Sequence, residues 1–137
     1  MNKPIIYLAG NMTPSPDSYK KWTTEMGSKL SKKFRTSPSV FKDGQKFIVR
    51  QDLGRLTNAH MVIANLGVTD TNHHLTGLIV ECYEAFKQNM PVYAFVSNDL
   101  ERSHQANSPW LQEFITKEFN SEDEMLEYLL ENENLQV

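Results

Sequence analysis

Met61-Val62-Ile63-Ala64-Asn65-Leu66 is a short, mostly apolar run in which β-branched side chains are frequent and polar positions do not alternate with apolar ones. A continuous run of this length is typical of a strand covered on both faces, as in the middle of a parallel sheet. Residues 5–9 (IIYLA) and 92–96 (VYAFV) have the same character. The three runs therefore predict central strands of one parallel sheet.

The segments between these runs carry helix signals. Ser15-Pro16-Asp17 offers an N-cap, a proline at the first helical position and an acidic first turn. One apolar stripe follows at helical spacing, formed by Tyr19, Trp22, Met26 and Leu30. Two further helices are predicted at about 50–58 and 77–88, the second ending near Asn89. A last helix begins at the capping box of residues 121–124 (SEDE).

Alternating strands and helices, joined by right-handed crossovers, predict a small doubly wound α/β sandwich with a four- or five-stranded, mostly parallel sheet. The chain of 137 residues has the size of one domain, and we assign residues 1–130 to it and 131–137 to a polar C-terminal tail. Ligands of such sheets bind outside the carboxyl ends of the strands. We therefore expect the site in the loops at 10–15, 67–76 and 97–109.

Composition and charge exclude several function classes. The net charge is −3, and no basic stripe is present to bind a nucleic acid polymer. The one cysteine, Cys82, has no internal partner, and no Cys/His cluster has metal-ligand spacing. We expect a cytoplasmic protein with no metal, no cofactor and no membrane-spanning segment.

Two features stand out within the predicted loops and helices. The turn Gly10-Asn11-Met12 leads into a helix start, a geometry that holds an anion or a sugar hydroxyl but also serves as a plain turn. It lacks the lysine of a P-loop, which disfavours a nucleoside triphosphatase. Glu81 stands in an apolar stretch of helix that starts at the carboxyl edge of the sheet. Its carboxyl group is either near the crevice or an ordinary solvated or tyrosine-paired group.

The ordered set of these segments resembles the nucleoside 2-deoxyribosyltransferase family. The stretches are IYLAG at 6–10, RQDL at 50–53, MVIANL at 61–66, GLIVECYEAF at 77–86 and PVYAF at 91–95. The resemblance spans roughly residues 4–97. It implies a flavodoxin-like three-layer sandwich that cleaves the N-glycosidic bond of 2′-deoxynucleosides and passes the deoxyribose to another base. A related branch of the family hydrolyses deoxynucleoside 5′-monophosphates.

The resemblance also implies roles for individual residues. Glu81, four residues after Gly77, matches the glutamate that attacks C1′ and forms a glycosyl-enzyme ester. Asp52 matches an aspartate that orients or protonates the base, and Tyr7 matches a tyrosine that hydrogen-bonds the nucleophile. Asn107 resembles an asparagine that one subunit lends to its neighbour's sugar site. On this basis the partner is a small-molecule nucleoside or nucleotide.

The sequence departs from the family pattern at two positions. Leu75 stands six residues before Glu81, where family members commonly have an aspartate that protonates the base, and Tyr83 stands where many have glycine. Either Asp70 or His74 takes over the missing role, or the activity differs, or catalysis has been lost. The alternative to an enzyme is then a catalytically degenerate nucleotide-binding protein of the same fold.

The expected site therefore has three catalytic residues, Tyr7, Asp52 and Glu81. The expected substrate-binding residues are Gly10, Asn11, Met12, Asp70, His74, Gly77 and Asn107. So small a domain has little material to enclose a nucleoside, so we predict a homo-oligomer whose neighbour closes the site with Asn107 and Trp110.

Overall fold

The computed structural model describes residues 3–10, 16–38, 48–70 and 74–132. In chain order the elements are β1 (Ile5–Ala9), α1 (Pro16–Leu30), β2 (Arg35–Pro38), α2 (Ile48–Thr57), β3 (Met61–Asn65), β4 (Gly67–Val68), α3 (Thr76–Lys87), β5 (Val92–Phe95), β6 (Glu101–Arg102), the 3-10 helix η1 (His104–Asn107), α4 (Pro109–Phe114), β7 (Lys117–Glu118) and α5 (Glu122–Glu131).

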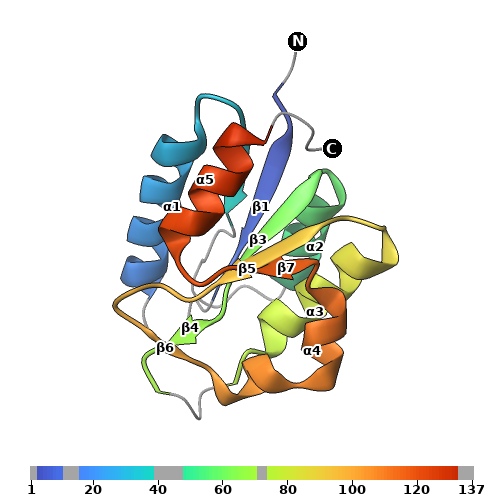
Figure 1. Ribbon diagram of the computed structural model, residues 1–137. Helices are drawn as coiled ribbons and strands as arrows, with labels where there is room; N and C mark the ends of the chain where they lie inside the picture. The colour runs from blue at the N-terminus through green and yellow to red at the C-terminus, as the bar shows by residue number, and fades with distance from the viewer. Residues whose placement is uncertain (1–2, 11–15, 39–47, 71–73, 133–137) are drawn as a thin grey trace.

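The main sheet has five strands in the order β2-β1-β3-β5-β7, and every neighbouring pair is parallel. This is the doubly wound, flavodoxin-like order, in which the direction of winding reverses between β1 and β3. A second, two-stranded antiparallel sheet pairs β4 with β6 just beyond the carboxyl ends of the central strands (Figure 1). The predicted α/β sandwich is confirmed.

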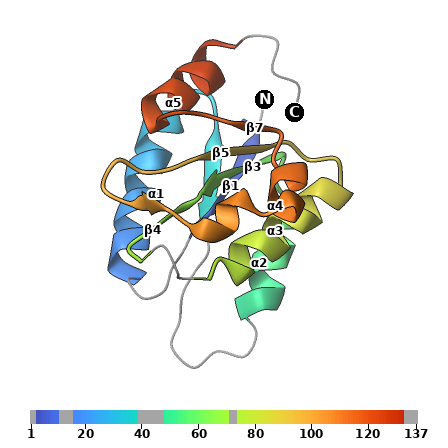
Figure 2. The same cartoon turned by 60° about the horizontal axis from the view of Figure 1, so that its bottom comes forward.

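Helices cover both faces of the sheet. α1 and α5 lie on one face, and α2, α3 and α4 lie on the other (Figure 2). Because side chains alternate along a strand, each central strand contributes side chains to the hydrophobic cores on both faces of the sheet. Ile6 and Leu8 pack toward α1 and α5, whereas Tyr7 and Ala9 belong to the core beneath α2, α3 and α4.

The three predicted central strands are confirmed as β1, β3 and β5, and the predicted helices are present with ends that differ by one or two residues. The sequence analysis did not identify the edge strands β2 and β7 or the helix α4. It also expected residues 97–109 to be one long loop, and this was wrong. That segment contains β6 and η1, which are fixed because Ser103 is fully buried and its N–H donates to the Leu66 carbonyl at 3.1 Å.

Two predicted helix ends have the expected capping chemistry. The Ser121 side chain accepts a hydrogen bond from the Glu124 N–H at the start of α5. After α3, Asn89 adopts a left-handed conformation with φ 57°. The Met90 N–H donates to the Ala85 carbonyl and the Asn89 N–H to the Phe86 carbonyl, which is the Schellman arrangement. This cap turns the chain back into β5.

None of the helices in the described ranges is both long and apolar enough to cross a membrane.

A buried polar network ties together the carboxyl ends of β3 and β5. The Asn65 amide donates to Ser97 Oγ at 2.7 Å, and its oxygen accepts from the N–H groups of Gly67 at 3.0 Å and Ser97 at 3.3 Å. Asn65 is only 5% exposed. One side chain therefore satisfies two buried backbone donors and orients both loops that leave the sheet here.

Replacing Asn65 by alanine should destabilise the fold by about 2–4 kcal/mol, because two buried N–H groups lose their acceptor. Urea unfolding followed by circular dichroism measures this free energy. The matched control is Asn98→Ala, at an exposed position of the same loop, which should change the stability by less than about 0.5 kcal/mol. Equal midpoints for Asn65→Ala and the parent chain would contradict the assigned role of the network.

Candidate active site

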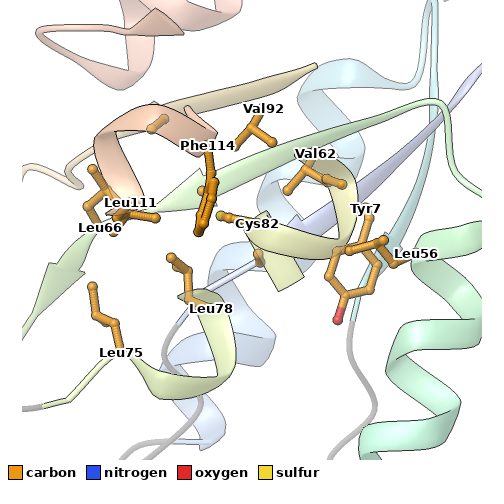
Figure 3. Close-up of a cluster of buried hydrophobic side chains, with 14 of the residues drawn as sticks. Tyr7, Leu56, Val62, Leu66, Leu75, Leu78, Cys82, Val92, Leu111 and Phe114 are labelled. Carbon is orange, nitrogen blue, oxygen red and sulfur yellow. The ribbon is translucent and has the colours of Figure 1, made fainter. Parts of the chain in front are cut away.

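The side chains of Tyr7 and Glu81 meet between the sheet and α3. Tyr7 lies in the middle of β1 and is completely buried. Its ring lies in the apolar cluster near Leu56 and Val62, with the hydroxyl pointing away from Val62 (Figure 3). That hydroxyl donates a hydrogen bond to Glu81 Oε2.

The pattern of α3 places Glu81 at the border of the core. The buried positions of this helix, Leu78, Cys82 and Ala85, form one stripe with the spacing of an inward face. Glu81 lies directly beside that stripe and is half-buried. Its carboxyl group therefore extends along the boundary between apolar core and helix surface.

Asp52 completes the group from α2. It is 8% exposed and pairs with Arg55, one helical turn later, at 3.2 Å between Oδ1 and Nη1. Its charge acts on both Tyr7 and Glu81, raising the pKa of each. The structure thus brings together Tyr7, Asp52 and Glu81 from three separate elements, while their catalytic roles stay predictions.

Burial governs the protonation of the pair. The pKa of Glu81 is raised from 4.5 to about 8. Desolvation raises it most, the hydrogen bond from Tyr7 lowers it, and the nearby Asp52 carboxylate raises it. We expected the Tyr7 bond to offset desolvation. It acts in that direction, but burial is the larger effect. The pKa of Tyr7 is raised well above its ordinary value, first by burial and then by Glu81, so Tyr7 stays a hydrogen-bond donor.

The start of α3 is held by a side chain from η1. The Leu75 N–H donates to Gln105 Oε1 at 2.5 Å, and Gln105 Nε2 lies 2.9 Å from His74 Nδ1. Leu75 itself is 2% exposed and belongs to the core beneath α3 (Figure 3). The position where the resemblance predicts an aspartate is therefore a packing position here, and the neighbouring His74 lies at the surface.

Sequence reasoning missed Gln105, because a single glutamine in a polar stretch belongs to no motif. Its link to α3 depends on a contact between residues 30 positions apart. Only the folded chain shows that contact.

The remaining predicted binding residues are more scattered. Gly10 follows β1, and a Cβ added there would lie 3.3 Å from the Trp22 ring of α1. At Gly77 an added Cβ would meet no atom of the described residues within 4 Å. Asp70 is exposed after β4, and Asn107 is exposed at the end of η1. Asn11 and Met12 lie outside the described residues.

A separate polar cavity of about 510 Å³ opens at the carboxyl ends of β1, β3 and β5, on the α1 and α5 side of the sheet. Gly10, Asn65 and Ser97 line it together with acidic residues of α1, α5 and the loop after β5. Of the predicted site residues that the structure describes, only Gly10 borders this cavity. The residues around Tyr7 belong to the opposite face.

In the parts of the chain that the structure describes, no three His, Cys, Asp or Glu side chains converge as metal ligands would.

Comparison with solved structures shows which known fold this arrangement matches. A conserved protein from Enterococcus faecalis V583 superposes with a TM-score of 0.69 at 16% identity, over 94% of this chain and 98% of that one. A 2-deoxyribosyltransferase from Leishmania mexicana superposes with a TM-score of 0.60 at 16% identity, over 69% of this chain. The fold is nucleoside 2-deoxyribosyltransferase-like.

The match with the Leishmania enzyme includes 65% of that protein's length. No protein-family model matches the sequence, and no curated protein matches it. The resemblance found in the short sequence stretches is therefore confirmed at the level of the fold.

The raised pKa of Glu81 makes stability depend on pH. Folding raises this pKa from its ordinary value of 4.5 to about 8, so the folded chain keeps a proton that the unfolded chain releases in this window. The stability that Glu81 contributes is full below about pH 4.5 and is lost as the pH rises through 8. Glutamine cannot ionise. Glu81→Gln should therefore gain stability over the parent chain as the pH rises, by an amount on the order of a few kcal/mol at pH 8.

Thermal and urea unfolding of both proteins between pH 5 and 9 measures this difference. Glu127→Gln, at an exposed position of α5, is the control that should show no such gain. A difference that stayed constant or shrank with rising pH would mean that Glu81 ionises freely in the folded protein.

Proposed function

We propose that this protein cleaves the N-glycosidic bond of 2′-deoxynucleosides or of their 5′-monophosphates, with Glu81 as nucleophile. The observation that carries the proposal is the buried Glu81 carboxyl group, hydrogen-bonded by Tyr7 and lying near Asp52. A carboxyl group with so strongly raised a pKa beside a second carboxylate is typical of catalytic sites. The fold shared with a 2-deoxyribosyltransferase supports the choice of substrate.

The chemistry proceeds by two displacements at C1′. A Glu81 oxygen forms a bond to C1′ while the bond from C1′ to the base nitrogen breaks, and the base leaves with the electron pair. The sugar acquires oxocarbenium character, which the carboxylate stabilises. A second base, or water, then forms a bond to C1′ while the ester bond to Glu81 breaks. The attacking group loses one proton, which balances the proton that the departing base takes up. The product is a new deoxynucleoside or deoxynucleotide when a base attacks, and deoxyribose or its 5′-phosphate when water attacks.

Tyr7 and Asp52 have different effects on this nucleophile. The Tyr7 hydroxyl stabilises the ionised form of Glu81 and fixes one carboxyl oxygen, which leaves the other oxygen for C1′. Asp52 raises the pKa of Glu81 and so makes the released carboxylate more basic. Because only ionised Glu81 attacks, the rate should rise with pH toward about 8.

Glu81→Ala should lower base release by on the order of 10³-fold or more, because the covalent route is lost. Deoxynucleosides and their 5′-monophosphates are incubated with and without an acceptor base, and free base is measured by chromatography. Intact-protein mass spectrometry should show a deoxyribosyl adduct on the parent chain and none on the variant. Glu84→Gln, one turn later on α3, is the matched control and should keep its activity within about twofold.

Two results would overturn the proposal. One is turnover undiminished in Glu81→Ala. The other is thermal stabilisation by nucleotides with no base released from any of them, which would indicate the nucleotide-binding alternative.

We also propose that the active unit is a homo-oligomer formed through α3 and α4. Trp110 is 75% exposed, and Tyr83 and Phe86 are 43% exposed each. Both α3 rings pack against Phe114 of α4, with ring centroids 5.3 and 5.2 Å from it. An aromatic surface of this kind is typical of a protein interface. Asn107 lies two residues before the start of α4. A second copy that covers this surface would therefore lie beside Asn107, the residue expected to reach into the neighbour's sugar site.

Trp110→Glu should weaken self-association by at least tenfold, because a charge replaces an aromatic side chain in the apolar interface. Sedimentation velocity over a range of concentrations measures the association. Thr24→Glu, at an exposed position of α1 on the other face of the sheet, is the control. A parent chain that is monomeric at all concentrations would contradict the proposal.

A further inference from the structure

Asp52 and Leu56 lie on the same face of α2. They are four positions apart, the spacing at which side chains of a helix are neighbours, and both are buried. The Leu56 side chain lies beside the ring of Tyr7 (Figure 3). The face of α2 that carries Asp52 is therefore the face toward Tyr7, and the Asp52 charge acts on both Tyr7 and Glu81.

Arg55 brings the opposite charge to Asp52. The two residues are three positions apart on α2, which also makes them neighbours on the helix. Arg55 Nη1 donates to Asp52 Oδ1 at 3.2 Å. The Asp52 side chain is 12% exposed and the Arg55 side chain 32%. The carboxylate is thus inside the fold, and the guanidinium reaches it from the surface, so water screens this ion pair less than it screens a fully exposed one.

The two carboxyl groups of the site have unequal partners. Glu81 accepts a hydrogen bond from the Tyr7 hydroxyl, which is neutral, whereas Asp52 accepts one from a guanidinium, which is always charged. A charged donor stabilises a carboxylate more than a neutral donor does. When two such groups lie close together in little water, the one with the weaker partner keeps its proton. By this argument Asp52 is the ionised group and Glu81 the protonated one.

We propose that Arg55 is a positioning residue of the candidate site, which holds Asp52 as a carboxylate with one oxygen fixed, so that Glu81 is the group that gains and loses a proton. The inference rests on the proposed function of Glu81. Arg55 acts through Asp52 and needs no contact with the substrate. It also limits what Asp52 can do, because a carboxylate accepts hydrogen bonds and has no proton to give to a departing base.

Carboxyl ¹³C spectra of a chain labelled at Asp and Glu test this charge distribution without any substrate. The signals of Asp52 and Glu81 are identified by their absence in Asp52→Asn and Glu81→Gln. In the parent chain the Asp52 signal should stay that of a carboxylate between pH 5 and 9. In Arg55→Met it should titrate within this range, because the buried carboxylate has lost its cation. An Asp52 signal that stays ionised throughout in Arg55→Met would overturn the proposal.

Further variants separate the effect of charge from that of packing. Arg55→Lys keeps the positive charge and should leave Asp52 ionised. Lys29→Met removes the cation that pairs with Glu122 between α1 and α5, on the other face of the sheet, and should change neither titration. Circular dichroism at pH 5 checks that Arg55→Met is folded. The double variant Asp52→Asn/Arg55→Met removes both charges together and leaves no unpaired carboxylate at this position.

The pH profile of kcat/KM tests the role in the reaction. Loss of a positive charge beside two coupled carboxyl groups makes both bind protons more strongly. The rise of kcat/KM in Arg55→Met should therefore lie at higher pH than in the parent chain, and each pH unit of displacement lowers kcat/KM about tenfold below the plateau. Asp52→Asn should move the rise to lower pH, because the carboxylate that raises the pKa of Glu81 is gone. Adding Arg55→Met to Asp52→Asn should then move it little.

The outcomes separate this proposal from the proposed function. Activity that requires Glu81 but has the same pH profile in Arg55→Met as in the parent chain overturns the role of Arg55 alone. A displacement of equal size with and without Asp52 shows that Arg55 does not act through Asp52, which also overturns that role. A parent chain that releases no base from any substrate overturns the proposed function, and the carboxyl spectra still decide whether Arg55 holds Asp52 ionised.

Discussion

The hydrogen bond between Tyr7 and Glu81 joins residues 74 positions apart, and the arrangement of the fold makes it possible. β1 and β3 are parallel neighbours, and α3 follows β3 on the face toward which Tyr7 points. The Tyr7 hydroxyl then donates one hydrogen bond to the Glu81 carboxyl group, which burial has largely removed from water. One hydrogen bond does not restore the lost solvation, so the proton stays on Glu81 to about pH 8.

The two ends of the candidate site depend on the same strand. Beyond β3, the Leu66 carbonyl holds Ser103, and Ser103 holds Gln105 at the start of α3. β3 also pairs with β1. Tyr7 lies on β1, and its hydroxyl bonds Glu81 in the middle of α3. The start of α3 and the Tyr7–Glu81 pair are therefore supported by separate contacts.

Elements with their own local signal could be predicted from the sequence, and elements that depend on a partner could not. β1, β3 and β5 are continuous apolar runs, and α5 has a capping box. β2 and β7 are short and polar at the edges of the sheet, with sequences RTSP and KE. They are extended because their neighbours supply hydrogen bonds, such as that from the Arg35 N–H to the Pro4 carbonyl.

The candidate site likewise contains features that the sequence could predict and features that only the folded structure shows. The residues Tyr7, Asp52 and Glu81 could be selected because a resemblance in ordered stretches of sequence pointed to them. The dominance of burial over the Tyr7 hydrogen bond depends on how completely α3 covers the pair, and no spacing of residues encodes that. Leu75 was visible as a departure from the family pattern. That its side chain joins the core, and that His74 beside it bonds Gln105, required the packed structure.

The choice of side chain at position 81 is not explained by folding. A glutamine of the same shape would accept the same bond from Tyr7 and would not lose stability as the pH rises. Leu75 is the opposite case, because an aspartate there would place a charge in the apolar cluster beneath α3. Position 75 thus has an apolar side chain that packs in the core, whereas position 81 has a carboxyl group where its burial is costly. A carboxyl group that stands where folding favours a neutral side chain supports the proposal that Glu81 acts through an ionisable oxygen.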